Sequence, residues 1–411
     1  MTFAPALGLR TVHTREVDDP GALLALAPTD EVVTWLHDGE GLVGWGEHDR
    51  LVVTGPDRFA EAEGWWQAVL ADLLVDDEVT LPGTGPVCFG SFAFDEREPS
   101  VLVVPRVVVG RSAGRCWVST LDGDERDHVA VRAPEAPGPV RFADGARKSA
   151  DWSAVVASAV GRIGAGALDK VVLARDLEAC TEAPIDLRWP LARLAERYPD
   201  CRTFAVDGLI GATPEILVRL VGDRATSRVL AGTFRRTGDP AGDAAEAEAL
   251  SRSSKDLEEH EYAVRSVADA LAEHSRAVQV PDAPFVLHLP NVMHLATDVR
   301  ARVDRASTVL SIVDSLHPSA AVCGTPTDRA GQLIAELEGM SRGRYAGPVG
   351  WVDARGDGEW GIALRCGERD PHDLRRMRLF AGCGIVAGSV PADELAESVA
   401  KLVPMRDALQ G

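Results

Sequence analysis

Residues 348–366 read PVGWVDARGDGEWGIALRC, two β-rich runs that flank Asp357 and Gly358. An Asp-Gly pair between such runs is typical of a tight turn and predicts an antiparallel hairpin. Short strand-like runs separated by glycine or aspartate turns also fill most of the stretch from residue 31 to about residue 120. Hairpins of this kind favour antiparallel over purely parallel sheets.

Helical spacing of apolar residues interrupts these strands at 56–74, 151–165, 241–275, 327–339 and 392–403. Hairpins mixed with long helices predict an α+β fold with mixed or largely antiparallel sheets flanked by helices, rather than a doubly wound parallel sheet. The stretch 121–150 is polar and contains several prolines, so we interpret it as a connection. It would join a β-rich portion, 1–120, to the larger region 151–411 within one unit.

The chain carries 43 Lys and Arg against 63 Asp and Glu, a formal charge of −20. Such a charge repels phosphate backbones and anionic membrane surfaces, so neither nucleic acid nor a membrane is an expected partner. The seven cysteines are scattered without a CxxC spacing, as in reduced cytoplasmic proteins. We therefore expect a cytoplasmic protein. The sequence has no Walker A, HExxH or GxSxG motif in a suitable context, which argues against nucleotide cofactors and the common hydrolase mechanisms.

Two acidic clusters on predicted helices are candidates for a metal site. Asp256 and Glu259 lie opposite the apolar stripe of the helix within 241–275, and Glu394, Glu397 and Lys401 share one face of the helix at 392–403. One glutamate from each helix would suit Mg²⁺, which takes few carboxylates and completes its shell with other oxygens. A solvated acidic face and an exposed salt-bridge ladder are the alternatives from spacing alone.

The ordered segments of the second half resemble the chorismate-utilising enzymes, which include isochorismate, salicylate, anthranilate and aminodeoxychorismate synthases. The segments that carry the resemblance are DKVVLARD (169–176), GATPEILVRL (211–220), LAGTFRR (230–236), SSKDLEEHE (253–261), MHLATDV (293–299), LHPSAAVCGTP (316–326), RYAGPVGW (344–351), IALRCG (362–367), LFAGCGIVAGS (379–389) and ELAESVAKL (394–402). The resemblance covers roughly 150–405. GPVCFGSFAFD and SVLVVPRVVV, within 85–109, resemble the isochorismate synthase branch.

The resemblance implies a single chorismate-binding unit, dependence on Mg²⁺ and substitution on the ring of chorismate. Lys170 matches the lysine that activates water in this family, and a lysine can do so only where its surroundings favour the neutral amine. Glu215 matches the general acid, which needs apolar surroundings to hold a proton near neutral pH. Glu259 and Glu397 match the metal ligands, and Asp256 and Glu394 match the acids that orient metal-bound water.

Other matched positions are expected to hold the substrate, which is a dianion. They are His294, Tyr345, Arg365, Gly382, Gly384 and Lys401. A lone histidine is more often a core residue, and a short glycine-rich turn often has no ligand, so His294 and the two glycines depend on the resemblance. Metal and local cations would together reverse the negative charge of the chain around an anionic substrate.

Local residues select among the branches. Lys170 stands where ammonia-using members generally carry glutamine, and Ala231 stands where the aminodeoxychorismate branch carries a nucleophilic lysine. The resemblance therefore favours isochorismate synthase, of the menaquinone or siderophore type, with no glutaminase subunit. Salicylate synthase, which also eliminates pyruvate, and a non-catalytic chorismate-binding sensor are the alternatives. Departures from the family pattern are Thr213, Cys383 and Ser398.

Overall fold

The computed structural model describes residues 10–28, 31–122, 133–236, 239–288, 292–304 and 307–410. It gives the backbone but not the side chains of 231–235, 240–241, 254–256, 258–259 and 292. No helix in the described ranges is long and apolar enough to cross a membrane.

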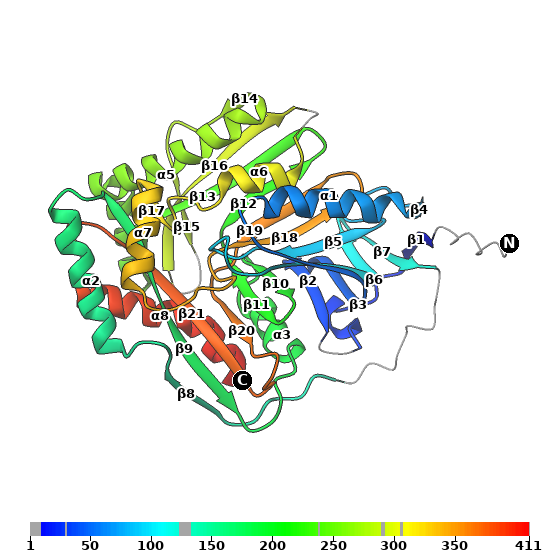
Figure 1. The fold of residues 1–411 in the computed structure, drawn as a ribbon, viewed down its shortest axis with the longest axis horizontal. Coiled ribbons are helices and arrows are strands. Elements are labelled where there is room, and N and C mark those ends of the chain that lie inside the picture. Colours follow the sequence, from blue (N-terminus) through cyan, green and yellow to red (C-terminus); the bar gives the residue numbers. More distant parts are fainter. Residues whose placement is uncertain are drawn as a thin grey trace.

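The helices of the structure alternate with groups of strands along the chain (Figure 1). They are α1 (Arg58–Ala71), α2 (Ser149–Gly164), α3 (Arg188–Arg197), α4 (Pro240–Arg252), α5 (Ser254–Glu273), α6 (Val309–Leu316), α7 (Thr327–Leu337) and α8 (Pro391–Gln410), with a short 3-10 turn η1 (Leu23–Leu26). The predicted helix 241–275 is divided at Ser253 into α4 and α5. Two shorter helices, α3 and α6, were not predicted.

The strands are joined by hydrogen-bonded ladders, and all the ladders described are antiparallel except the one between β1 and β4. In chain order they are β1 (Arg10–Val17), β2 (Val32–His37), β3 (Glu40–Val53), β4 (Leu73–Asp77), β5 (Val87–Ser91), β6 (Ser100–Ser112), β7 (Arg115–Leu121), β8 (Val140–Asp144), β9 (Lys170–Thr181), β10 (Arg202–Val206), β11 (Leu209–Thr213), β12 (Ile216–Val221), β13 (Arg224–Arg235), β14 (Ser275–Gln279), β15 (Phe285–His288), β16 (Val292–Val303), β17 (Gly324–Thr325), β18 (Pro348–Asp353), β19 (Gly358–Ile362), β20 (Cys366–Arg369) and β21 (Arg376–Ile385). The α+β fold with largely antiparallel sheets is therefore confirmed, and the hairpin predicted at 348–366 is β18–β19.

Two layers of strands are joined where β10 pairs with both β2 and β11. From β10 one layer continues through β11, β20, β21 and β9, and α8 packs on β21. The other layer continues from β2 through β3, β6 and β5 to β18, β19, β12, β13 and β16. Strands from the first and second halves of the sequence thus share the same layers.

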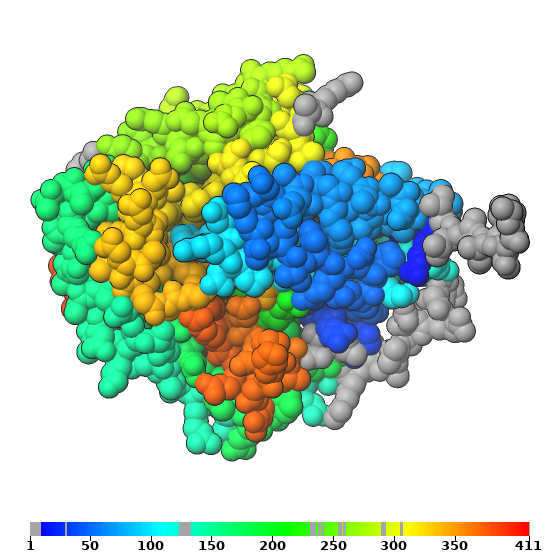
Figure 2. Space-filling model, viewed as in Figure 1, coloured from blue at the N-terminus to red at the C-terminus, as the bar shows by residue number. Residues whose placement is uncertain are grey.

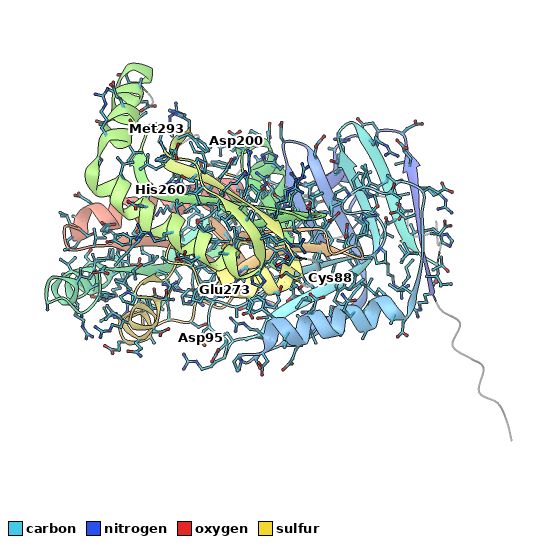
Figure 3. The ribbon with its side chains drawn as sticks, turned by 90° about the horizontal axis from the view of Figure 1, so that it is seen from above. Cys88, Asp95, Asp200, His260, Glu273 and Met293 are labelled. Carbon is cyan, nitrogen blue, oxygen red and sulfur yellow. The ribbon has the colours of Figure 1, made fainter. Side chains whose placement is uncertain are left out.

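The β5–β18 ladder makes this sharing direct, because Gly90 of the N-terminal portion pairs with Gly350. Figure 2 shows the N-terminal segments, in blue and cyan, beside C-terminal segments in orange on the same face. In Figure 3, where Cys88 on β5 is labelled, α1 runs along one side of these strands. Cys88 is fully buried, and Trp360 on β19 packs within the same core cluster. The segment predicted as a connection, 121–150, contains β8, which pairs with β9.

Candidate active site

One cavity of about 220 Å³ lies between the two layers and brings together residues that are far apart in the sequence. The predicted site residues that line it are Lys170, Glu215, His294, Tyr345, Arg365, Gly382, Gly384, Glu394, Glu397 and Lys401. Asp256 and Glu259 belong to α5, but their side chains lie outside the described part of the chain. The cavity therefore contains every predicted site residue whose side chain is described.

Lys170 is the first residue of β9 and lines the cavity half-buried. Its backbone pairs with Thr325 on β17, and β21 pairs with β9 from Val171 onward. Gly324 makes the β17 contact possible, since its φ is +139° and a Cβ there would lie 2.2 Å from the carbonyl oxygen of Lys170. No L side chain could be placed at that distance, so a glycine is required beside the lysine.

Glu215 lies in the short link between β11 and β12, and its residue is only 8% exposed. Its amide donates a hydrogen bond to Oγ1 of Thr213 at 3.3 Å, and its carbonyl accepts one from the amide of Ile362 at 3.2 Å. Burial raises the pKa of the Glu215 carboxyl to about 8, although Lys170 and Lys401 act in the opposite direction. The carboxyl is thus protonated at neutral pH, which is the state that a general acid needs.

The opposite part of the cavity is rich in cationic groups. Lys401 on α8 donates a hydrogen bond to the carbonyl oxygen of Gly382 at 2.9 Å and lies 2.6 Å from a carboxylate oxygen of Glu397. Arg365, 8% exposed, has a φ of +49° and enters the cavity from the link between β19 and β20. Burial lowers the pKa of the Arg365 guanidinium, but an arginine remains charged at any physiological pH. These two cations can bind a carboxylate of a ligand.

Tyr345 adds a hydroxyl to this cationic end. Its ring stacks on Phe380 with a centroid separation of 5.1 Å and an interplanar angle of 7°. A Cβ at Gly382 would lie 2.9 Å from the tyrosine oxygen, so the glycine leaves room for the hydroxyl group. Burial raises the pKa of the Tyr345 phenol well above its ordinary value. The phenol therefore remains a hydrogen-bond donor at neutral pH.

Three side chains, two of which line the cavity, form a group that could hold a metal ion. One ligand atom each of Cys383, Glu394 and Glu397 lies within 4.8 Å of the others. Burial would raise the pKa of the Glu397 carboxyl, but Lys401 and Arg365 outweigh it, and the pKa is lowered overall. Two carboxylates suit a hard divalent cation. The Cys383 thiol instead donates to the carbonyl oxygen of Glu394 at 3.3 Å, and burial raises its pKa well above the ordinary value.

Sequence reasoning did not identify several residues that shape the cavity. Leu230, Val322, Leu364 and Val386 provide apolar walls, which a ring would contact. Outside the residues that line the cavity, His260 on α5, labelled in Figure 3, has Nε2 at 2.7 Å from Oγ1 of Thr297 on β16 and joins these two elements. It lies beside Glu259 in the sequence, and its buried position could have been predicted from the helical stripe. The side chain of Ala231, used above to separate two branches, lies outside the described part of the chain.

The chain matches the family model described as "Chorismate binding enzyme" over residues 13–410. The isochorismate synthase DhbC of Bacillus subtilis is 35% identical over 79% of this chain and 81% of that protein. The salicylate biosynthesis isochorismate synthase of Pseudomonas aeruginosa is 34% identical over 91% and 84%. The structure of MenF, the menaquinone-specific isochorismate synthase of Escherichia coli, is similar with a TM-score of 0.80 and 25% identity, covering 98% of this chain and 95% of that one.

These matches confirm the resemblance found in the sequence, including its similarity to isochorismate synthases in particular. The match begins in the first strand and ends in the last helix, so it includes the N-terminal β-rich portion as well. The family is one of enzymes, and the relatives and the structural neighbour carry the name isochorismate synthase. The chain belongs to the chorismate-binding enzyme family.

Proposed function

We propose that the protein is an isochorismate synthase, which adds water at C2 of chorismate while hydroxide leaves C4. The observation that carries this proposal is that Lys170 and Glu215, whose pKa is raised by burial, line one cavity, so that the proposed base and acid would face the same ligand. Attack of water and departure of a hydroxyl need one group of each kind. The relatives named isochorismate synthases support the same assignment.

In the proposed reaction Lys170 accepts the proton of the attacking water and Glu215 gives its proton to the leaving hydroxyl. Each transfer balances the other, because one proton enters the protein and one leaves it. Lys401, Arg365 and the Tyr345 hydroxyl would bind the carboxylates of the substrate, and the backbone at Gly382 and Gly384 allows close approach. His294 would contact the ring from β16.

We further propose that the enzyme requires Mg²⁺. Glu397 and Glu259 would hold the ion, and Glu394 and Asp256 would orient its water molecules. The described donor set fits a hard cation, since Glu394 and Glu397 offer carboxylate oxygens close together, and the lowered pKa keeps Glu397 ionised. When bound, the ion supplies positive charge for the ring carboxylate of the substrate. We expect this activity in the cytoplasm, without a glutaminase subunit.

The test is to incubate the purified protein with chorismate, with and without Mg²⁺, and to separate the products by chromatography. Magnesium-dependent isochorismate without pyruvate is the expected result. Salicylate with pyruvate would assign the protein to the salicylate synthases instead. If the protein binds chorismate but leaves it unchanged, the assignment as an enzyme would be rejected in favour of a non-catalytic chorismate-binding sensor.

A matched variant controls this test. Lys170→Ala should lose about 10²–10⁴-fold in rate, the usual contribution of a general base, and should still bind chorismate in the presence of Mg²⁺. Unchanged turnover in this variant would exclude Lys170 as the base.

A further inference from the structure

Strand β9, which begins with Lys170, has two edges with different partners. One edge pairs with β21 from Val171 to Cys180. On the other edge β17 pairs with Lys170 and Val171, the Val172 amide donates to the carbonyl oxygen of Cys323 at 2.8 Å, and β8 pairs from Leu177 onward. Between these two short ladders, side chains bind the backbone of β9 in place of a strand.

Three of these bonds involve buried side chains. A guanidinium nitrogen of Arg342 donates to the carbonyl oxygen of Val172 at 2.8 Å, and the Ala174 amide donates to Oε1 of Glu338 at 2.7 Å. The indole nitrogen of Trp152 donates to the Ala174 carbonyl oxygen at 3.0 Å. Backbone groups that would otherwise be buried without partners are therefore satisfied by side chains.

Glu338 and Arg342 also bind each other. The Nε of Arg342 donates to Oε2 of Glu338 at 2.9 Å, and a second guanidinium nitrogen contacts Oε1. Glu338 is 2% and Arg342 5% exposed, and the guanidinium carbon lies 4.1 Å from the ring centroid of Phe94. A bidentate pair of this kind has a fixed geometry, so both side chains are held rigidly where they meet β9.

The pair also reaches a second wall of the cavity, because Arg342 donates to the carbonyl oxygen of Val322 at 2.9 Å. Val172 and Val322 both line the cavity. Val172 is two residues from Lys170, and alternate residues of a strand share a face. A shift of the backbone at Val172 would therefore move the lysine relative to Glu215, which lines the same cavity.

We infer that the buried pair Glu338–Arg342 positions the start of β9, and with it Lys170, against the cavity wall at Val322. This inference rests on the proposed function for its effect on catalysis. The two residues act through the backbone of β9 and are positioning residues. An apolar pair of similar volume could fill the same space, but it could not bind the carbonyl oxygens of Val172 and Val322 or the amide of Ala174.

The main test replaces both charges together by Glu338→Leu and Arg342→Met, since removal of one partner alone would leave an unpaired buried charge. We expect kcat to fall about 100-fold, as for a displacement of a catalytic group by about 1 Å, with KM within about threefold of the parent. The Ala174 amide should exchange with solvent at least about tenfold faster, because its acceptor is lost. Unchanged kcat together with unchanged Ala174 exchange would overturn the inference.

Arg188→Met is the matched control. Arg188 is 6% exposed, pairs with Asp186 at 2.6 Å and donates to the carbonyl oxygen of Ala27 at 2.9 Å, but it does not line the cavity. It should lose thermal stability while kcat stays within about twofold of the parent. An equal loss of kcat in the control would show that general destabilisation explains the effect, and would overturn the inference.

Glu338→Gln covers the case in which the double variant fails to fold. It keeps an oxygen acceptor for the Ala174 amide, so we expect Ala174 protection to be retained and kcat to stay within about tenfold of the parent. A Glu338→Gln protein that keeps Ala174 protection but loses about 100-fold or more in kcat would contradict the inference. Amide exchange also distinguishes failure of this inference from failure of the proposed function. It tests whether Glu338 and Arg342 position β9 even if the parent protein leaves chorismate unchanged.

Discussion

Glu215 and Glu397 are two carboxyl groups in the same cavity, and their surroundings have opposite effects on them. Burial raises the pKa of Glu215 to about 8, whereas that of Glu397 is lowered, because Lys401 and Arg365 outweigh its burial. The two pKa values differ in direction because of geometry: the Glu397 carboxylate lies 2.6 Å from the Lys401 ammonium. Lys401 also acts on Glu215, but too weakly to offset desolvation.

Under the proposed function, the comparison explains how one cavity could contain both an acid and a metal ligand, each of them a glutamate. A protonated carboxyl can donate a proton, and an ionised carboxylate can bind a cation. The division follows from which element carries each residue. The link between β11 and β12 buries Glu215, while α8 places Glu397 one helical turn from Lys401.

The largest expected effect is on the acid side. Glu215→Gln keeps the size of the side chain but cannot give up a proton, so kcat should fall about 10³-fold. Chromatographic assay of isochorismate formation measures the change. The concentration of Mg²⁺ that gives half the maximal rate should stay the same, because Glu215 is not a metal ligand. Full activity in this variant would show that Glu215 is not the acid, and the proposed difference in role between Glu215 and Glu397 would be wrong.

A smaller effect is expected on the metal side. Glu397→Gln removes a charged ligand, so the half-saturating Mg²⁺ concentration should rise about 10–100-fold, while saturating metal restores much of the rate. Glu336→Gln is the control, since Glu336 is an exposed residue of α7 that pairs with Arg162 on α2. A Mg²⁺ titration like that of the parent would mean that Glu397 serves only to neutralise Lys401.

The pH dependence sharpens the comparison further. The acid must be protonated to act, so the ratio of kcat/KM in the parent to kcat/KM in Glu215→Gln should fall as pH rises above about 8, by about tenfold for each pH unit. The sign follows from the raised pKa, because the protonated fraction is nearly complete below that value and decreases above it. The residual rate of Glu215→Gln should lack this decrease. A ratio that stays flat between about pH 7 and pH 10 would contradict the assignment.

The sequence predicted which residues line this cavity better than it predicted the side chains that support them. Lys170, Glu215 and Glu397 belong to ordered segments that resemble a known family, and the structure brings them to one cavity. Hairpins were also predictable, because the turn at Asp357 and Gly358 has a local signature. These features depend on residues close together in the sequence.

Features that depend on distant residues were not predictable. Helix α6 is only Val309–Leu316, too short for a periodic pattern to stand out, and α4 and α5 form one apolar pattern that the backbone divides at Ser253. The pair Glu338–Arg342 has the spacing of an ordinary exposed helical ion pair, and only the tertiary structure shows that it is buried against β9. Burial of charge is decided by neighbours from other segments.

The smallest expected effect is at Cys383, the third member of the cluster with Glu394 and Glu397. Its thiol is buried and donates to the Glu394 carbonyl oxygen, so it should stay protonated, and only a thiolate would compete for the metal. Cys383→Ala should therefore change kcat and the half-saturating Mg²⁺ concentration by less than about threefold. A parallel titration with Zn²⁺, which prefers sulfur ligands, makes the test stricter. If the Zn²⁺ concentration that halves the rate rose at least tenfold in the alanine variant, the thiol would be a ligand. The metal would then not be bound by carboxylates alone.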